Sequence, residues 1–251
     1  MVAAMGAVLY VVPASHPCAA VERALTLKGI VYERVDLLPI VHVAAQLARF
    51  GQGTVPGLVL EGGEKVVGSR PIFHRLDELV PEPRLIPDDA EVKRADEWGD
   101  QVLQPLVRRL VWATLRRRTD AMPSYSEGAD LPVPVRLAAL GGAAVAAAEV
   151  RLSAASDENA RADLVNLGFH LDRIDRWIDE GKLGTAAVSA ADLQIASSLR
   201  LLLTLGDVAP FVEGRPAEGL ARAQFPQWPG HVPAGVLPDA WLRAGRAAEG
   251  R

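Results

Sequence analysis

Apolar positions follow two different periods along the chain. Near the N-terminus, short apolar runs at 8–12 and 58–60 are bounded by Pro or Gly, which is typical of buried strands. From residue 90 onward, apolar positions recur every three or four residues over long segments, which predicts amphipathic helices. The pattern therefore divides the chain into a mixed α/β part and an all-helical part.

The first part begins with a strand, a helix and a second strand. The strand at 8–12 precedes a helical pattern that contains Val21, Ala24 and Leu25, and the second strand at 30–36 follows Gly29, a natural helix C-cap. A strand, helix and strand within about thirty residues predict a right-handed crossover and parallel strand pairing. The remaining elements predicted here are a weak helix at 39–50, a hairpin with Gly62-Gly63 as its turn, and a helix at 70–79 with Ser69 as its N-cap.

A proline-dense segment at 81–88 marks a domain boundary. We therefore expect one domain at 1–80, a linker at 81–88 and an all-helical domain at 89–251. Its predicted elements are a helix at 90–118 kinked by Pro105, a loop at 119–134, helices at 135–155, 157–179 and 189–205, and a Gly- and Pro-rich tail from Phe211 that wraps the surface and could cover the active-site cleft. Ser189 and Asp192 form a capping-box pattern before an apolar helix, so we interpret Asp192 as a structural residue.

Composition narrows the class of protein. The chain has 251 residues, of which 49% are hydrophobic and 23% charged, which is ordinary for globular proteins. A net charge of −4 gives no reason to expect nucleic acid or an anionic membrane as a partner. The sequence shows no signal-peptide pattern and no apolar run of about 18 residues, so no membrane span is predicted. The single cysteine excludes an internal disulfide and fits a reducing compartment, so we expect a cytoplasmic protein.

Candidate chemistry gathers at the start of the first helix, in Ser15-His16-Pro17-Cys18. A helix N-terminus stabilises anions, including a thiolate, through open backbone N–H groups and the helix dipole. Ser15 is either a plain N-cap or a hydrogen-bond donor that lowers the pKa of a bound thiol. Cys18 is either a buried, inert residue or a reactive thiol, and the buried reading is slightly favoured. His16 is interpreted as a solvated residue of the cap region, with polarisation of a thiol or binding of a carboxylate as the alternative.

Two later positions also allow two readings. Pro56 either lies trans at a strand edge or forms a cis bond that holds backbone groups against a ligand. Ser69 caps a helix, and its hydroxyl together with free N–H groups could also hold a carboxylate.

The remaining titratable residues predict no metal site, because His42, His74, His170 and His231 lack metal-ligand spacing. The basic stretch of Arg108, Arg109 and 116–118 is interpreted as a solvated face, with an anion-binding wall beside the cleft as the alternative.

The order of strand, S-x-x-C helix, strand, helix, Thr54-Val55-Pro56, hairpin, Gly68-Ser69 and helix resembles the N-terminal domain of the glutathione S-transferase family. The resemblance covers roughly residues 7–205 and implies a thioredoxin-like domain followed by a helical bundle. It places the catalytic residue of the Ser- and Cys-type members at Ser15, with Cys18 one turn later. Further implied contacts to the thiol compound are the backbone of Val55 before a cis Pro56, the Gly68-Ser69 pair at the γ-glutamyl group, and the side chains of His16 and Arg70.

The function that the resemblance implies is conjugation of glutathione, or another small thiol, to an electrophilic small molecule, as in detoxification. Gly68 stands where the family usually has an acidic residue or Gln, which puts glutathione itself in question. The resemblance also implies a cytoplasmic homodimer with the acceptor near Trp98 to Trp112. The alternatives are a thiol oxidoreductase, lyase or isomerase that uses Cys18, and a non-catalytic binding protein of the same fold.

Overall fold

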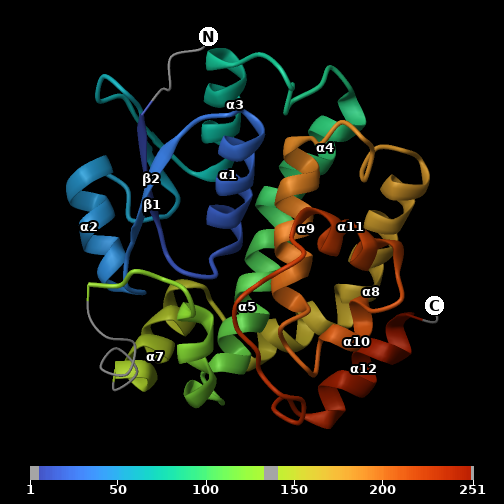
Figure 1. Ribbon diagram of the computed structural model, residues 1–251. Coiled ribbons are helices and arrows are strands. Elements are labelled where there is room, and N and C mark those ends of the chain that lie inside the picture. Colours follow the sequence, from blue (N-terminus) through green and yellow to red (C-terminus); the bar gives the residue numbers. More distant parts are fainter. Residues whose placement is uncertain (1–5, 133–140, 250–251) are drawn as a thin grey trace.

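A small mixed sheet forms the first half of the molecule. The computed structural model describes residues 6–132 and 141–249. The strands β1 (Ala7–Val11), β2 (Tyr32–Asp36), β3 (Gly57–Val59) and β4 (Lys65–Val67) lie in the order β2-β1-β3-β4 (Figure 1). β1 pairs parallel with β2 and antiparallel with β3, and β4 pairs antiparallel with β3. The parallel pairing predicted from the strand–helix–strand order is confirmed, and the arrangement is the thioredoxin-like sheet that was expected.

Three helices complete this sheet half: α1 (His16–Leu27), α2 (Val41–Phe50) and α3 (Ser69–Leu79). α1 and α3 pack against each other between the sheet and the remaining helices, whereas α2 lies at the opposite side of the sheet (Figure 1). The prediction that Ser69 caps α3 is wrong, because Gly68 is the N-cap and Ser69 is already helical. Gly68 has φ +90°, a conformation that favours glycine, so it can make the turn from β4 into the helix.

The predicted long helix at 90–118 is divided into three parts. α4 (Ala90–Trp98) leads into a π-helical turn (Gly99–Leu103), and α5 (Gln104–Leu115) follows without a break in the chain direction. Pro105 has no N–H to donate to the preceding turn, so the π-helical turn lies where a regular α-helix would lose a hydrogen bond. The expected irregularity therefore lies just before Pro105.

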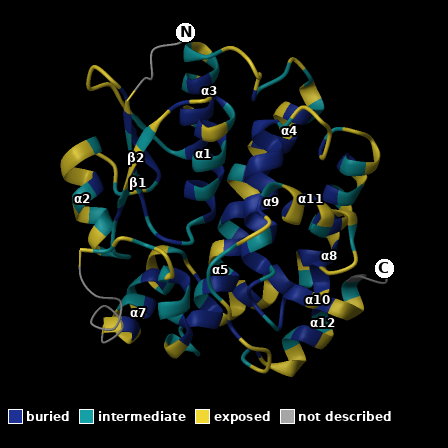
Figure 2. Cartoon of the chain, viewed as in Figure 1, coloured by how far each residue is buried: buried dark blue, intermediate teal, exposed yellow. Residues whose placement is uncertain are grey.

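The rest of this helical half surrounds one buried helix. Its elements are a 3₁₀ helix (Thr119–Ser126), α7 (Gly142–Leu152), α8 (Asp157–Asp179), α9 (Ala190–Leu202), α10 (Ala209–Val212), α11 (Pro216–Gln224) and α12 (Asp239–Glu249). The predicted helix at 135–155 is confirmed over α7, and residues 135–140 lie outside the described residues. α9 is buried along nearly its whole length and contacts α1, α4, α5 and α11 (Figure 2). Within the described parts of the chain, no helix is both long enough and apolar enough to span a membrane.

The C-terminal tail is tied to the helical half by one carboxylate. Asp207 accepts hydrogen bonds from the backbone N–H groups of Gly235, Val236 and Leu237 at 2.6–2.7 Å. Gly230 lies so close to the Tyr125 ring that a Cβ atom there would meet a ring carbon at 2.3 Å, and its φ of +92° also favours glycine. The tail therefore packs behind Tyr125 on the 3₁₀ helix.

The predicted capping box of α9 is confirmed. The Asp192 carboxylate accepts hydrogen bonds from Ser189 N–H at 2.8 Å, Ser189 Oγ at 2.6 Å and Gly184 N–H at 2.7 Å. Asp192 is 1% exposed, so water cannot reach these donors and take the place of the carboxylate as their acceptor. The carboxylate thus fixes both the start of α9 and the preceding loop.

We expect Asp192→Ala to lower the free energy of unfolding by about 3 kcal/mol, because it removes a cap and leaves buried donors unpaired. For a chain of this length the melting temperature should fall by roughly 6–12 °C. Asp120→Ala removes the same charge at an exposed pair with Arg118 and should leave the melting temperature unchanged. Equal melting temperatures for the two variants would contradict this role of Asp192.

Candidate functional site

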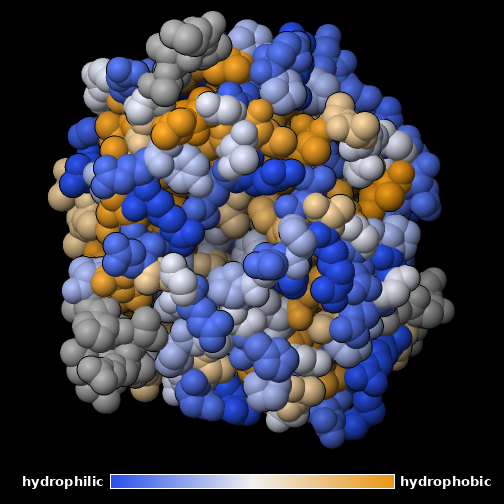
Figure 3. All heavy atoms as spheres, in the orientation of Figure 1, coloured by the Kyte–Doolittle hydropathy of each residue, from blue (hydrophilic) through white to orange (hydrophobic). Residues whose placement is uncertain are grey.

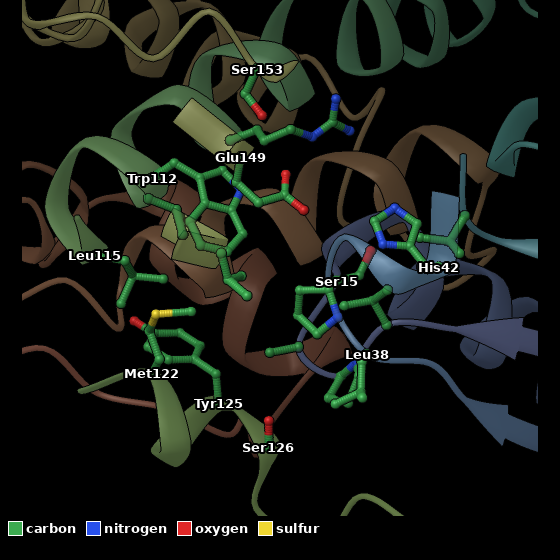
Figure 4. A pocket seen from close by; sticks show the side chains of 18 of the residues that line it. Ser15, Leu38, His42, Trp112, Leu115, Met122, Tyr125, Ser126, Glu149 and Ser153 are labelled. Atoms are coloured by element: carbon green, nitrogen blue, oxygen red, sulfur yellow. The ribbon is translucent and has the colours of Figure 1, made fainter. Parts of the chain in front are cut away.

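A cavity of about 550 Å³ lies between the two halves. The face drawn in Figure 3 is hollowed near its centre, and Figure 4 shows the cavity from close by. One wall comes from the start of α1, the loop before α2 and the segment before β3. The other wall comes from α5, the 3₁₀ helix and α7. Its volume is typical of pockets for small organic ligands.

Ser15 lies on the first wall with Leu38 and His42 (Figure 4). Its backbone has the extended N-cap conformation of α1, with φ −68° and ψ 117°, but its side chain makes no capping hydrogen bond. The hydroxyl is therefore not used to satisfy the helix end. Ser15 lines the cavity at the positive end of α1, where open backbone N–H groups favour an anion.

His16 also lines the cavity, but it is only 3% exposed, so the interpretation as a solvated residue is wrong. Ser198 Oγ donates its hydrogen to the Gln194 carbonyl at 2.8 Å and lies 3.1 Å from His16 Nδ1. Because that hydroxyl hydrogen is already used, His16 Nδ1–H is the donor and Nε2 carries the lone pair. Burial, and secondarily the positive charge of Arg108, lower the pKa of His16 well below its usual value. The neutral ring offers a proton acceptor and does not attract a carboxylate.

Cys18 lies away from the cavity lining and is 1% exposed. Burial raises the pKa of its thiol to about 12, and the hydroxyl of Ser15 and the backbone of Val12 offset only part of that effect. The thiol is therefore protonated at neutral pH and shielded from reagents. This environment agrees with the buried, inert reading of Cys18 and does not support the predicted catalytic role.

The Val55-Pro56 peptide bond is cis, as the resemblance implied. The Pro56 carbonyl accepts a hydrogen bond from Gly68 N–H at 2.9 Å, which ties this turn to the start of α3. Val55 lines the cavity, and neither of its backbone polar groups bonds another described residue. Its N–H and C=O can therefore pair with an extended peptide-like ligand.

The structure does not bring Gly68, Ser69 and Arg70 into the cavity. Ser69 is 3% exposed, and its hydroxyl donates to Gln194 Oε1 at 3.1 Å. Arg70 instead pairs with Asp96, with 2.7 Å between Nε and Oδ2. The Ser69 hydroxyl and the Arg70 guanidinium are thus already bonded within the protein, and the contacts to a γ-glutamyl group stay a prediction.

The second wall contains Trp112, one end of the predicted acceptor region, and further residues that were not predicted. Trp112 and Leu115 from α5, Met122 and Tyr125 from the 3₁₀ helix and Glu149 from α7 face the cavity opposite Ser15 (Figure 4). Their signal in the sequence is indirect, since apolar residues at helix spacing fit a core as well as a pocket. Only the joining of distant segments in the fold identifies them.

Trp98, the other end of the predicted acceptor region, lies elsewhere. Its ring packs against Trp177 and His170, with centroids 5.4 and 5.6 Å away.

Burial and charge set the protonation of the titratable groups on these walls. Burial raises the pKa of Glu149, and the charge of Arg108 and the backbone of Ile40 counteract part of that rise. Burial lowers the pKa of His42, which favours its neutral form. No three His, Cys, Asp or Glu side chains within residues 6–132 and 141–249 are placed to hold a metal ion.

The match to a known protein family covers the sheet half of the chain. Residues 9–84 match the family model described as the glutathione S-transferase N-terminal domain. No curated protein sequence matches the chain.

Three solved structures illustrate the similarity over the whole chain. A glutathione S-transferase from Rhodospirillum rubrum F11 is 22% identical, with 95% of this chain and 99% of that chain covered and a TM-score of 0.57. FzlA from C. crescentus is 20% identical, with 92% and 96% covered and a TM-score of 0.61. A maleylacetoacetate isomerase from Anaeromyxobacter dehalogenans 2CP-1, with glutathione bound in its active site, is 20% identical, with 96% and 95% covered and a TM-score of 0.53. Residues 9–84 thus match the glutathione S-transferase N-terminal domain, and the whole chain shares the fold of these solved structures.

Proposed function

We propose that this protein catalyses attack of a small thiol, with glutathione as the first candidate, on an electrophilic small molecule in the cavity. The thiol sulfur loses its proton and forms a bond to an electrophilic carbon. The displaced electron pair leaves with a leaving group, or moves to the neighbouring carbon, which then takes up a proton. The protein's part is to favour the thiolate and to hold the two reactants together.

The observation that carries this proposal is the position of the Ser15 hydroxyl. It stands at the N-cap of α1 without capping the helix, and it lines the cavity. A hydroxyl hydrogen bond and a positive helix end both favour the charged form of a bound thiol. The open backbone of Val55 on the same wall is placed to bind the peptide-like part of glutathione. The glutathione-bound isomerase of the same fold supports this choice of thiol.

The bond between Ser69 and Gln194 favours a thiol other than glutathione as the second candidate. The Ser69 hydroxyl donates to Gln194, so that hydrogen is not available for the γ-glutamyl contact that the resemblance implies. A smaller thiol than glutathione, or a thiol held mainly by the Val55 backbone, would suit such a site. A cytoplasmic homodimer remains part of the proposal on the strength of the family resemblance.

Calorimetric titration with glutathione, and in parallel with cysteine, tests which thiol binds. We expect Ser15→Ala to raise the pKa of the bound thiol and to slow transfer by about 10- to 100-fold, since a hydrogen bond to a charged group is lost. Ultraviolet difference spectra of the bound thiolate across pH, together with initial rates, measure both effects. Unchanged rates in Ser15→Ala would exclude this residue from the mechanism, and binding of neither thiol would favour a non-catalytic protein.

Tests on Cys18 distinguish the proposed transferase from the thiol oxidoreductase alternative. With a pKa of about 12, only about one part in ten thousand of this thiol is ionised at pH 8. We therefore expect Cys18→Ala to transfer thiol at the wild-type rate, and the native protein to resist iodoacetamide until it is unfolded. Loss of activity in a folded Cys18→Ala variant, or rapid alkylation of the native protein, would support the oxidoreductase alternative.

A further inference from the structure

Five arginines occur between residues 108 and 118, and four of them have carboxylate partners. Arg109 forms a two-point pair with Asp163, at 2.7 Å from Nε and 2.8 Å from Nη2. Arg116, Arg117 and Arg118 pair with the aspartates at 157 and 120. These four fit the solvated face expected for a basic stretch.

Arg108 differs from its neighbours in both position and bonding. It lines the cavity, and its side chain forms no hydrogen bond or ion pair with any residue in the described ranges 6–132 and 141–249. α5 presents Arg108, Val111, Trp112 and Leu115 to the cavity, which is the i, i+3, i+4, i+7 face of one helix. The guanidinium therefore stands at one end of an otherwise apolar wall.

The charges around Arg108 do not neutralise it by contact. Glu149 from α7 and Asp100 from the π-helical turn lie within electrostatic reach, and neither forms an ion pair with it within 4.0 Å. The rings of His16 and His42 on the opposite wall are held in their neutral forms. Arg108 is an exposed residue that lines the cavity, and a guanidinium stays charged in proteins. Its charge is therefore open to an anion that enters the cavity.

We propose that Arg108 binds a carboxylate on the electrophilic acceptor, so that the protein is selective for carboxylate-bearing electrophiles with an apolar body. This inference rests on the proposed function, because it names the acceptor of that same cavity. A guanidinium forms two parallel hydrogen bonds with a carboxylate, which fixes the orientation of the ligand as well as its charge.

The apolar side chains of the second wall fit the rest of such a molecule. Trp112, Leu115 and Met122 offer a hydrophobic surface to the cavity (Figure 4), which Arg108 also lines. Ser15 stands across the cavity from that surface, at the proposed place of the thiolate. A ligand anchored at Arg108 with its body against Trp112 would turn its remaining side toward the attacking sulfur. Glu149 also faces the cavity and lies within electrostatic reach of Arg108, so a ligand carboxylate must compete with it for the guanidinium.

The test uses an unreactive pair of ligands and needs no thiol. Calorimetry at neutral pH and low salt compares 3-phenylpropanoate with the neutral 3-phenylpropanamide, which has nearly the same shape. We expect the wild-type protein to bind the acid about 10- to 100-fold more tightly than the amide, the effect of a charge-assisted pair. Equal affinities in the wild-type protein would overturn the proposal and would indicate that Arg108 stabilises the charge of Glu149 instead.

Two arginine variants locate the effect. Arg108→Met should bring the acid and the amide to equal affinity, and Arg108→Lys should keep only part of the preference, because lysine lacks the two-point geometry. Arg118→Met removes the same charge outside the cavity lining and should keep the full preference. An undiminished preference in a folded Arg108→Met variant would overturn the proposal, and melting curves establish that each variant is folded.

Glutathione is the other possible source of a carboxylate at Arg108. Its affinity, measured separately, should be the same in wild-type and Arg108→Met protein. A weaker affinity for glutathione with no acid preference would assign Arg108 to the thiol compound and overturn the proposal. An acid preference without thiol transfer would instead contradict only the proposed reaction, whereas transfer without an acid preference would contradict only this inference.

Discussion

The packing of α1 against α9 is the constraint on which the site depends. α1 carries the candidate chemistry at its N-terminus, and α9 is the buried centre of the helical half. The bond between His16 and Ser198 joins the two helices at the cavity floor and fixes which nitrogen of the ring carries the proton. Because Ser198 is held in turn by the Gln194 carbonyl, the state of His16 is set by the helical half. A polar bond of this kind also makes the position of one half relative to the other specific.

Gln194 has a second effect on the contact between α9 and the sheet half. Its side-chain oxygen accepts hydrogen bonds from both Ser69 and Gln104, so a residue of α9 closes the position where the family resemblance places a ligand contact. The backbone of Val55 remains open, because neither of its polar groups bonds another described residue. Of the expected thiol site, the Val55 backbone is thus open and the Ser69 hydroxyl is bonded. The difference arises from the side chain of Gln194, 125 positions from Ser69 in the sequence.

The sequence predicted the elements well where local rules decide them. The parallel strand pair, the capping box at Asp192 and the cis bond at Pro56 all follow from short-range pattern or from a motif. The prediction that His16 is solvated was wrong, and the burial of Ser69 was not predicted, because α9 covers both residues. No local pattern in the sequence reveals which distant helix will cover a residue. The cavity wall of α5 was predicted only in part, for a related reason: of the expected acceptor region from Trp98 to Trp112, Trp112 lines the cavity and Trp98 does not. Arg108 and Arg109 are adjacent and chemically identical, and only the neighbours that folding supplies give them different roles.

That difference between two adjacent arginines bears on selectivity in this fold. Arg109 has its charge satisfied by Asp163, so it contributes to the packing of α5 on α8 and offers nothing to a ligand. Arg108 lines the cavity without an ion-pair partner among the described residues, so its guanidinium is available to a ligand anion. The thiol wall and the acceptor wall come from different halves of the chain. Changes in α5 and α7 can therefore alter the acceptor while the helix end at Ser15 stays the same.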